Sequence, residues 1–167
     1  KPDLQFTFRD EIEPIFNEYI SLLFEDSQPD LRKVININND LKITEIENYL
    51  QCGKLNLVNL LDVKEKISPE ATIYLVSLPN RYEVILKQKN GTLKHFSTSK
   101  QIINLAAENI KRNVQNSTFS NYSETTSQES FAQLYNQIIS PIKRLLPDKG
   151  TIVFSLDSNL RDLPWGM

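Results

Sequence analysis

The strongest constraint on the fold is the segment 72–99, which is rich in β-branched and aromatic residues. Residues 72–79 (TIYLVSLP) form a short apolar run that ends at Pro79-Asn80, and residues 81–99 form two extended stretches on either side of Asn90-Gly91. Asn-Gly between extended stretches is typical of a two-residue hairpin turn, because both central residues must accept positive φ. The segment therefore predicts one strand followed by a β-hairpin.

A two-residue turn at Asn90-Gly91 also fixes which hairpin residues face one another. The turn would place Lys87 directly opposite Lys94. Because like charges in that position repel, this pair favours an exposed sheet edge that resists aggregation over an RNA-binding surface. Counting outward from the turn predicts four cross-strand pairs: Lys89 with Thr92, Lys87 with Lys94, Leu86 with His95, and Ile85 with Phe96.

Apolar residues at helical spacing surround this β segment. Residues 10–25 predict an amphipathic helix with Pro14 in its first turn, and residues 31–50 predict a second helix after a break at 27–30. A third helix is predicted after Ser99 as its N-cap, and a fourth after a capping box at Thr126–Glu129. The predicted buried stripes are Ile12, Ile15, Phe16, Tyr19, Ile20 and Leu23 in the first helix, Ile103, Ala106, Ala107, Ile110 and Val114 in the third, and Phe131, Leu134, Tyr135, Ile138, Ile139 and Ile142 in the fourth.

Residues 151–157 (TIVFSLD) form a last apolar run. Because the run does not alternate, it predicts a strand buried on both faces, as in a parallel sheet covered by helices. The predicted fold class is α/β. Its parts are a helical lead-in over 1–68, a small sheet with a β-hairpin flanked by helices over 69–148, and a further strand within 149–167.

Composition limits the classes of partner. The chain has 167 residues, of which 24% are charged, and a formal net charge of −2, which gives no electrostatic reason to expect nucleic acid or an anionic membrane as a partner. No stretch approaches the roughly 20 apolar residues that a bilayer span needs. A single cysteine excludes an internal disulfide, so we predict a cytoplasmic protein. The opening KPDLQF, without an initiator Met, favours a piece of a longer protein.

The only cysteine, Cys52, and the only histidine, His95, are the one pair that could form a thiolate–imidazole dyad. Neither lies near a nucleophile elbow or a sequence that would form an oxyanion hole, so we favour Cys52 as a small apolar side chain and His95 as a half-buried strand residue. One His, one Cys and scattered carboxylates do not make a metal site, and no glycine-rich phosphate loop is present. We therefore predict no metal and no cofactor.

The segment after the last strand is the remaining candidate site. In open α/β sheets ligands bind beyond the carboxyl ends of strands, which is where Asp157 and Arg161 fall. A purely structural reading explains the same segment, with Leu160, Leu163 and Trp165 packing and Pro164 fixing the chain. From the residues alone we favour that structural reading.

The segment GTIVFSLDSNLRDLPWGM (150–167) resembles the strand and turn that open the peptidase half of CHAT domains, which are caspase-like cysteine peptidase domains associated with tetratricopeptide repeats in bacterial proteins. The family pattern is an apolar strand, Pro-Asp-Gly or similar, and then Leu-Arg-x-(Ile/Leu)-Pro. Ser158 stands where Gly is usual, and the segments 8–24, 43–52 and 74–99 resemble the lead-in and first sheet of the same domains. The residues that match the pattern are Asp157, Leu160, Arg161, Leu163 and Pro164.

The resemblance implies that residues 149–167 supply the first strand of a caspase-like sheet. It implies a cysteine endopeptidase with protein or peptide substrates and with a helical repeat region in the same polypeptide. The family's catalytic His and Cys lie in later His-Gly and Ser-Ala-Cys-like elements, which this chain does not contain. No catalytic residue is therefore assigned, this chain alone is expected to be inactive, and Asp157 and Arg161 are expected to lie near the substrate.

Two other classes of function stay open. The first is a non-enzymatic interaction module, in which the hairpin edge and the helical lead-in bind a partner protein. The second is an enzyme that uses Cys52 and His95. RNA binding by Lys87 and Lys94 is a further alternative, and it requires both lysines on one face of the hairpin.

Overall fold

The computed structural model describes residues 11–50, 69–116, 124–156 and 158–165. The chain divides into two compact units, 1–68 and 69–167, which are described separately. The N-terminal unit contributes two helices, and the C-terminal unit contributes a four-stranded mixed sheet with helices, so the α/β class is confirmed. No described helix is both long enough and apolar enough to cross a bilayer.

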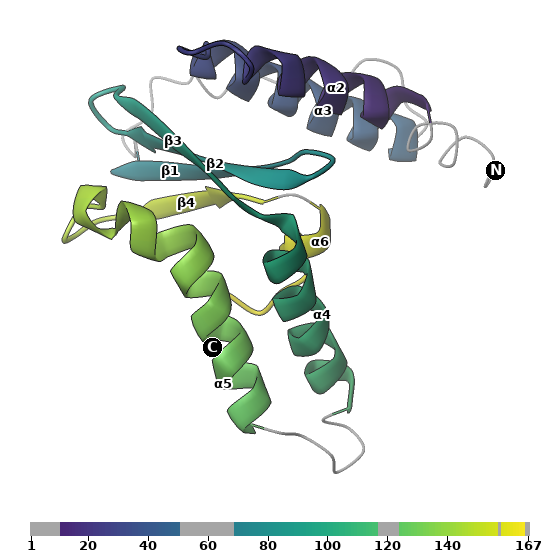
Figure 1. The fold of residues 1–167 in the computed structure, drawn as a ribbon, viewed down its shortest axis with the longest axis vertical. Coiled ribbons are helices and arrows are strands. Elements are labelled where there is room, and N and C mark those ends of the chain that lie inside the picture. Colours follow the sequence, from purple (N-terminus) through teal and green to yellow (C-terminus); the bar gives the residue numbers. More distant parts are fainter. Residues whose placement is uncertain (1–10, 51–68, 117–123, 157, 166–167) are drawn as a thin grey trace. The chain divides into compact units, whose positions relative to one another are not determined.

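The N-terminal unit is a pair of helices, α2 (Glu13–Leu23) and α3 (Leu31–Leu50), that run side by side (Figure 1). Pro14 lies in the first turn of α2, where its missing N–H removes no helical hydrogen bond. The break between the helices is confirmed. Asp30 begins the second helix because its Oδ1 accepts the backbone N–H of Lys33 at 3.1 Å. Cys52 lies outside the described residues.

The apolar stripe predicted for α2 is only partly buried. Ile20 is fully buried, whereas the Ile15 side chain is 65% exposed and the Tyr19 side chain 42% exposed. The expectation of one fully buried stripe is therefore wrong. The apolar residues of α2 cover more of its circumference than one packed face can bury.

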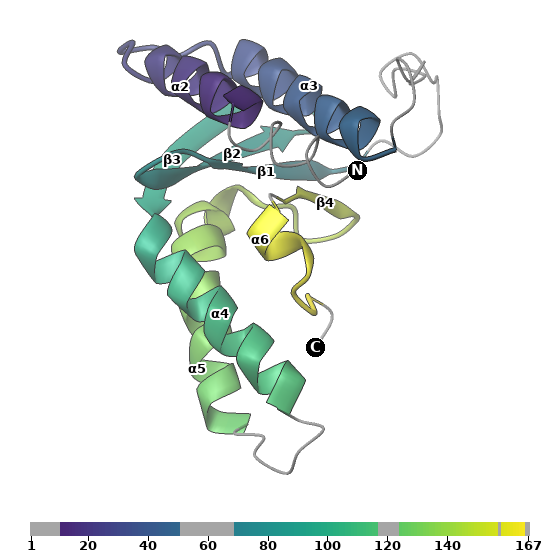
Figure 2. The same cartoon turned by 90° about the vertical axis from the view of Figure 1, so that its right-hand side faces the viewer.

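The C-terminal unit is built on the sheet order β3-β2-β1-β4, as Figures 1 and 2 show from two sides. The strands are β1 (Ala71–Ser77), β2 (Arg81–Gln88), β3 (Leu93–Ser99) and β4 (Ile152–Ser155). β1 and β2 are antiparallel, as are β2 and β3, whereas β4 pairs with β1 in parallel. The predicted strand, hairpin and last strand are all present. β4, which comes from residues 149–167, pairs directly with β1 of residues 69–148.

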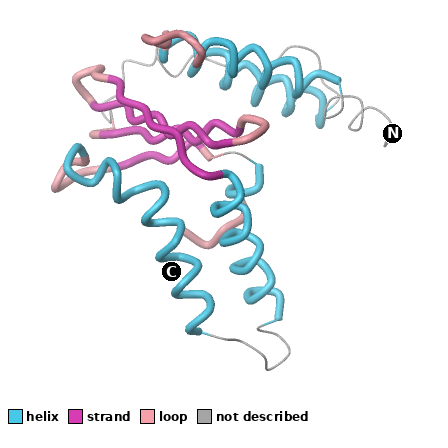
Figure 3. Tube along the Cα trace, in the orientation of Figure 1, coloured by secondary structure: helices cyan, strands magenta, loops and turns pink. Residues whose placement is uncertain are grey.

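The predicted register of the hairpin is wrong by one residue. The observed pairs include Ile85 with His95 and Leu86 with Lys94. The connection, a loop in Figure 3, is a three-residue loop: the Gly91 N–H donates to the Gln88 carbonyl at 2.9 Å, and the Gln88 N–H donates to the Thr92 carbonyl at 2.9 Å. Gly91 has φ +83°, the left-handed residue that follows a type I turn in such loops.

The shift in register moves side chains to the opposite face of the sheet. Phe96 is paired with Val84 and packs against the buried core, while His95 shares a face with Ile85. Lys87 is paired with Leu93, not Lys94, so the two lysines point to opposite faces. The RNA-binding alternative loses the shared face on which it depended.

Helices lie on one face of this sheet (Figure 2). They are α4 (Lys100–Asn116), α5 (Glu124–Leu134) and the short α6 (Ser158–Arg161). Ser99 is confirmed as the N-cap of α4, since its Oγ accepts the Ile102 N–H at 3.3 Å. The fourth helix begins at Glu124, so Thr126 is not its N-cap as predicted. It continues as a π-helical turn over Tyr135–Ile139 and a 3₁₀ segment over Ser140–Leu145, which has Pro141 near its start.

The core of the C-terminal unit lies between the sheet and these helices. Most predicted helical core positions are buried, but Val114 and Tyr135 are exposed, in contrast to the prediction. Val114 lies near the C-terminal end of α4, and Tyr135 is the first residue of the π-helical turn that follows α5. The buried cluster consists of Ala71, Ile73, Leu75, Tyr82, Val84, Leu86, Ile103, Ala106, Ala107, Ile110, Leu134, Ile138, Ile142, Leu160 and Leu163.

Candidate functional site at the edge strand

β4 is the edge strand of the sheet, and its only strand partner in the described chain is β1. Phe154 is paired with the buried Ile73, yet 38% of its side chain is exposed, and Val153 on the other face is exposed as well. The prediction that this strand is buried on both faces is therefore wrong. An apolar run shows that a strand suits burial, but it does not supply the neighbour that would bury it.

The segment after β4 folds back onto the core. Leu160 and Leu163 are buried in the main apolar cluster, as the structural reading of this segment predicted. Trp165 instead lies at the surface and stacks on Phe154, with ring centroids 5.8 Å apart. Its indole Nε1–H donates to the Leu160 carbonyl at 2.8 Å. The edge strand therefore carries an exposed aromatic pair that is linked to the buried Leu160 of α6 through the Trp165 indole.

The described part of the chain includes only one of the two residues predicted to lie near a substrate. Asp157 falls outside the described residues. Arg161 is exposed and is the last residue of α6, the helix that follows β4. The neighbouring Asp162 carboxylate lies 3.6 Å from the Lys111 ammonium of α4, an exposed contact that contributes little to stability. The structure thus places Arg161 in the helix that follows β4.

Tyr74 lies next to this edge, paired with Ser155 of β4 on one side and Ile85 of β2 on the other. Burial raises the pKa of its phenol above the ordinary value of 10.0, because the charged phenolate is disfavoured away from water. The phenol is therefore held in its neutral, hydrogen-bonding form well above neutral pH.

A polar cluster on β2 and β3 was not predicted from the sequence. Glu83 is 1% exposed, and its Oε1 accepts hydrogen bonds from Arg81 Nε and from Ser97 Oγ, each at 2.6 Å. His95 Nδ1 lies 3.4 Å from the other carboxylate oxygen. Only the true register places His95 and Ser97 on the face of Glu83, so the predicted register could not reveal the cluster.

This cluster bears on the Cys52–His95 alternative. A carboxylate beside Nδ1 is the orienting partner that a catalytic imidazole needs. However, the Ser97 hydroxyl of this cluster donates to Glu83, and Cys52 lies outside the described residues. The dyad therefore stays a prediction. Within the described ranges no three His, Cys, Asp or Glu side chains are grouped so that they could hold a metal ion.

Comparison of the chain with protein-family models, with curated proteins and with solved structures finds no match.

Proposed function

We propose that this chain is the N-terminal, non-catalytic portion of a CHAT-like, caspase-family cysteine endopeptidase that acts on protein substrates in the cytoplasm. The observation that carries the proposal is the place of β4 in the sheet. It is a short, apolar, parallel strand at the edge, with Val153 and Phe154 exposed. Parallel strands normally lie inside sheets with neighbours on both sides, so such an edge suits the addition of further strands.

The chain resembles the family in the segment that follows this strand. Leu160 and Leu163, two residues of the family pattern, are buried and hold the segment on the core. In the resembled family, a later His takes the proton of a later Cys, and the thiolate attacks the carbonyl carbon of the scissile peptide bond. The role proposed for this chain is to form the base of the sheet on which those elements would be carried.

Asp157 and Arg161 are proposed to lie near the substrate, because both follow the carboxyl end of β4. Further proposed partners are the protein or peptide substrate and a helical repeat region of the same polypeptide. No residue of this chain is proposed as catalytic.

The test begins with the coding sequence that follows residue 167. The proposal requires His-Gly and Ser-Ala-Cys elements there. A protein that includes them should cleave an unfolded protein substrate and lose cleavage when the Cys of the second element is replaced by Ala, whereas residues 1–167 alone should not cleave. A coding sequence without both elements, or an extended protein whose cleavage survives that Cys replacement, would rule the proposal out.

A non-enzymatic interaction module is the second candidate. The open edge of β4 favours it, because such an edge can accept an extended strand from a partner protein through main-chain hydrogen bonds. The same experiment separates the two candidates. The module is favoured where the elements are missing and the chain nevertheless binds an extended peptide through β4.

A further inference from the structure

Helix α2 carries an exposed apolar strip. Its members are spaced by three or four residues, which places them along one side of the helix. Ile15 is 65% exposed and Leu22 is 55% exposed, values far above those of ordinary packed helix residues. The strip consists of Ile12, Ile15, Tyr19 and Leu22.

This strip is distinct from the packed side of the helix. Ile20 is fully buried, and Phe16 and Leu23 are partly buried, about a quarter turn or more around α2 from Ile15 and Leu22. A helix that is apolar over so much of its surface is normally covered on more than one side. The geometry of a strip with three- and four-residue spacing fits another helix, whose side chains can interlock with it.

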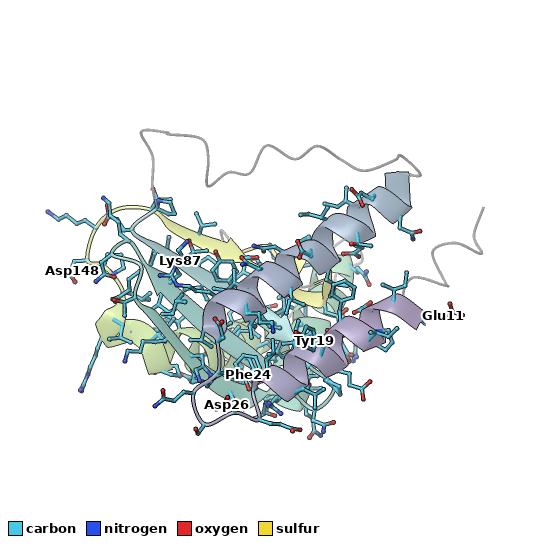
Figure 4. All side chains as sticks on the ribbon, turned by 90° about the horizontal axis from the view of Figure 1, so that it is seen from above. Glu11, Tyr19, Phe24, Asp26, Lys87 and Asp148 are labelled. Carbon is cyan, nitrogen blue, oxygen red and sulfur yellow. The ribbon has the colours of Figure 1, made fainter. Side chains whose placement is uncertain are left out.

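The two borders of the strip differ in charge. On its outer border Glu18 lies within α2, and Glu11 and Glu25, seven residues before and after it, lie just beyond the two ends of the helix; all three are exposed. On the other border the Lys33 ammonium of α3 lies 5.3 Å from the centre of the Tyr19 ring. Figure 4 shows Tyr19 on the side of α2 next to α3 and Glu11 at the N-terminal end of α2. The outer border is therefore negatively charged and would attract a cationic partner.

This charge pattern argues against a second copy of the chain as the partner. Two such strips packed antiparallel would set one row of glutamates against the other. Packed in parallel they would set the row against the border of Phe16 and Leu23, where the Lys33 ammonium already lies over the Tyr19 ring of its own chain. Opposite charges on the partner would instead attract the row.

We propose that the α2 strip binds an amphipathic partner helix whose apolar seam is bordered by Lys or Arg facing Glu11, Glu18 and Glu25. The surface lies in the N-terminal unit, so the proposal holds whether or not the chain belongs to a peptidase.

The test uses two synthetic helices of about four heptads with the same Ile/Leu seam, one with Lys and one with Glu at the flanking positions. Fluorescence anisotropy with the full chain is expected to show the Lys peptide binding at least about tenfold more tightly than the Glu peptide. The double variant Ile15→Ser/Leu22→Ser should weaken binding of the Lys peptide about tenfold or more. Ile46→Ser, which changes an exposed isoleucine of α3, is the matched control and should leave it unchanged.

Glu18→Lys keeps the apolar strip whole and tests the charge separately. This variant should reduce the preference for the Lys peptide. The proposal therefore stays testable if circular dichroism shows that the double variant is misfolded. Equal binding of the two peptides, or full binding by a folded double variant, would refute the proposal. Analytical ultracentrifugation gives a further test. If the unmodified chain is a dimer and the double variant is a monomer, the proposal is also refuted, because a second copy then occupies the strip.

Discussion

The Phe154 ring stacks on the Trp165 indole, with ring centroids 5.8 Å apart and ring planes 19° from parallel. The contact ties the edge strand to the segment after α6. Trp165 is the only tryptophan, so the tryptophan emission comes from the surroundings of this ring alone. Phe154→Ala is expected to shift the emission to longer wavelength and to lower the free energy of unfolding by about 1–2 kcal/mol, because the stack and a partly buried ring are lost. Urea unfolding followed by tryptophan emission measures both.

Val153→Ala is the control for that experiment, since Val153 is an exposed neighbour on the opposite face of β4. It should leave the emission wavelength unchanged. An unaltered emission spectrum in folded Phe154→Ala would show that the two rings do not stack in solution.

The carboxylate of Glu83 holds two strands together through Ser97 and also accepts a hydrogen bond from Arg81. Glu83→Ala should lower the free energy of unfolding by about 2–3 kcal/mol, because two hydrogen bonds to a charged, buried acceptor are lost. Ser97→Ala should cost about 1 kcal/mol, the value of one such hydrogen bond. Chemical denaturation measures both changes. Thr92→Ala, in the exposed hairpin loop, is the control, and equal stability of Glu83→Ala and Thr92→Ala would contradict the prediction.

The sequence predicted the existence and kind of the main described elements, because these depend on local periodicity and caps. Ser99 is an N-cap in the structure for the reason given in advance, and Pro14 lies in a first helical turn. The register of the hairpin was not predictable from Asn90-Gly91, since a Gly in the left-handed region serves a three-residue loop as well as a two-residue turn. That one-residue difference moved His95 and Ser97 to the face of Glu83.

The candidate site was predicted only in part, for a different physical reason. An apolar run such as 151–156 shows that a strand suits burial, but whether a neighbour buries it is a property of the sheet. Leu160 and Leu163 were correctly expected to pack, whereas the exposure of Phe154 was not foreseen. The exposed strip of α2 was missed in the same way, because periodicity assigns apolar residues to a helix face without showing how many neighbours that helix has.

Two glycines should differ in how well they tolerate Ala. Gly91→Ala is expected to cost about 1 kcal/mol, because its φ of +83° is unfavourable for a residue with a Cβ. Gly150→Ala should cost more, since Gly150 has φ +108° and an added Cβ would lie 2.4 Å from Glu70 Cγ. Thermal unfolding measures both. Glu70→Ala in the Gly150→Ala background should recover the steric part, and no recovery would show that backbone strain accounts for the whole cost.

Burial of Tyr74 gives stability a specific dependence on alkaline pH. Because its folded pKa is raised above the ordinary 10.0, the unfolded chain loses this proton first as the pH rises. The contribution of the neutral phenol is therefore complete below about pH 10 and declines as the pH rises through the folded pKa. Tyr74→Phe cannot ionise, so its free energy of unfolding should fall less steeply than that of the unmodified chain between about pH 8 and pH 11. Urea titrations across this range measure the two slopes.

Tyr135→Phe, which changes an exposed ring, is the control for this prediction. Identical slopes for the unmodified chain and Tyr74→Phe would show that Tyr74 is not buried in solution.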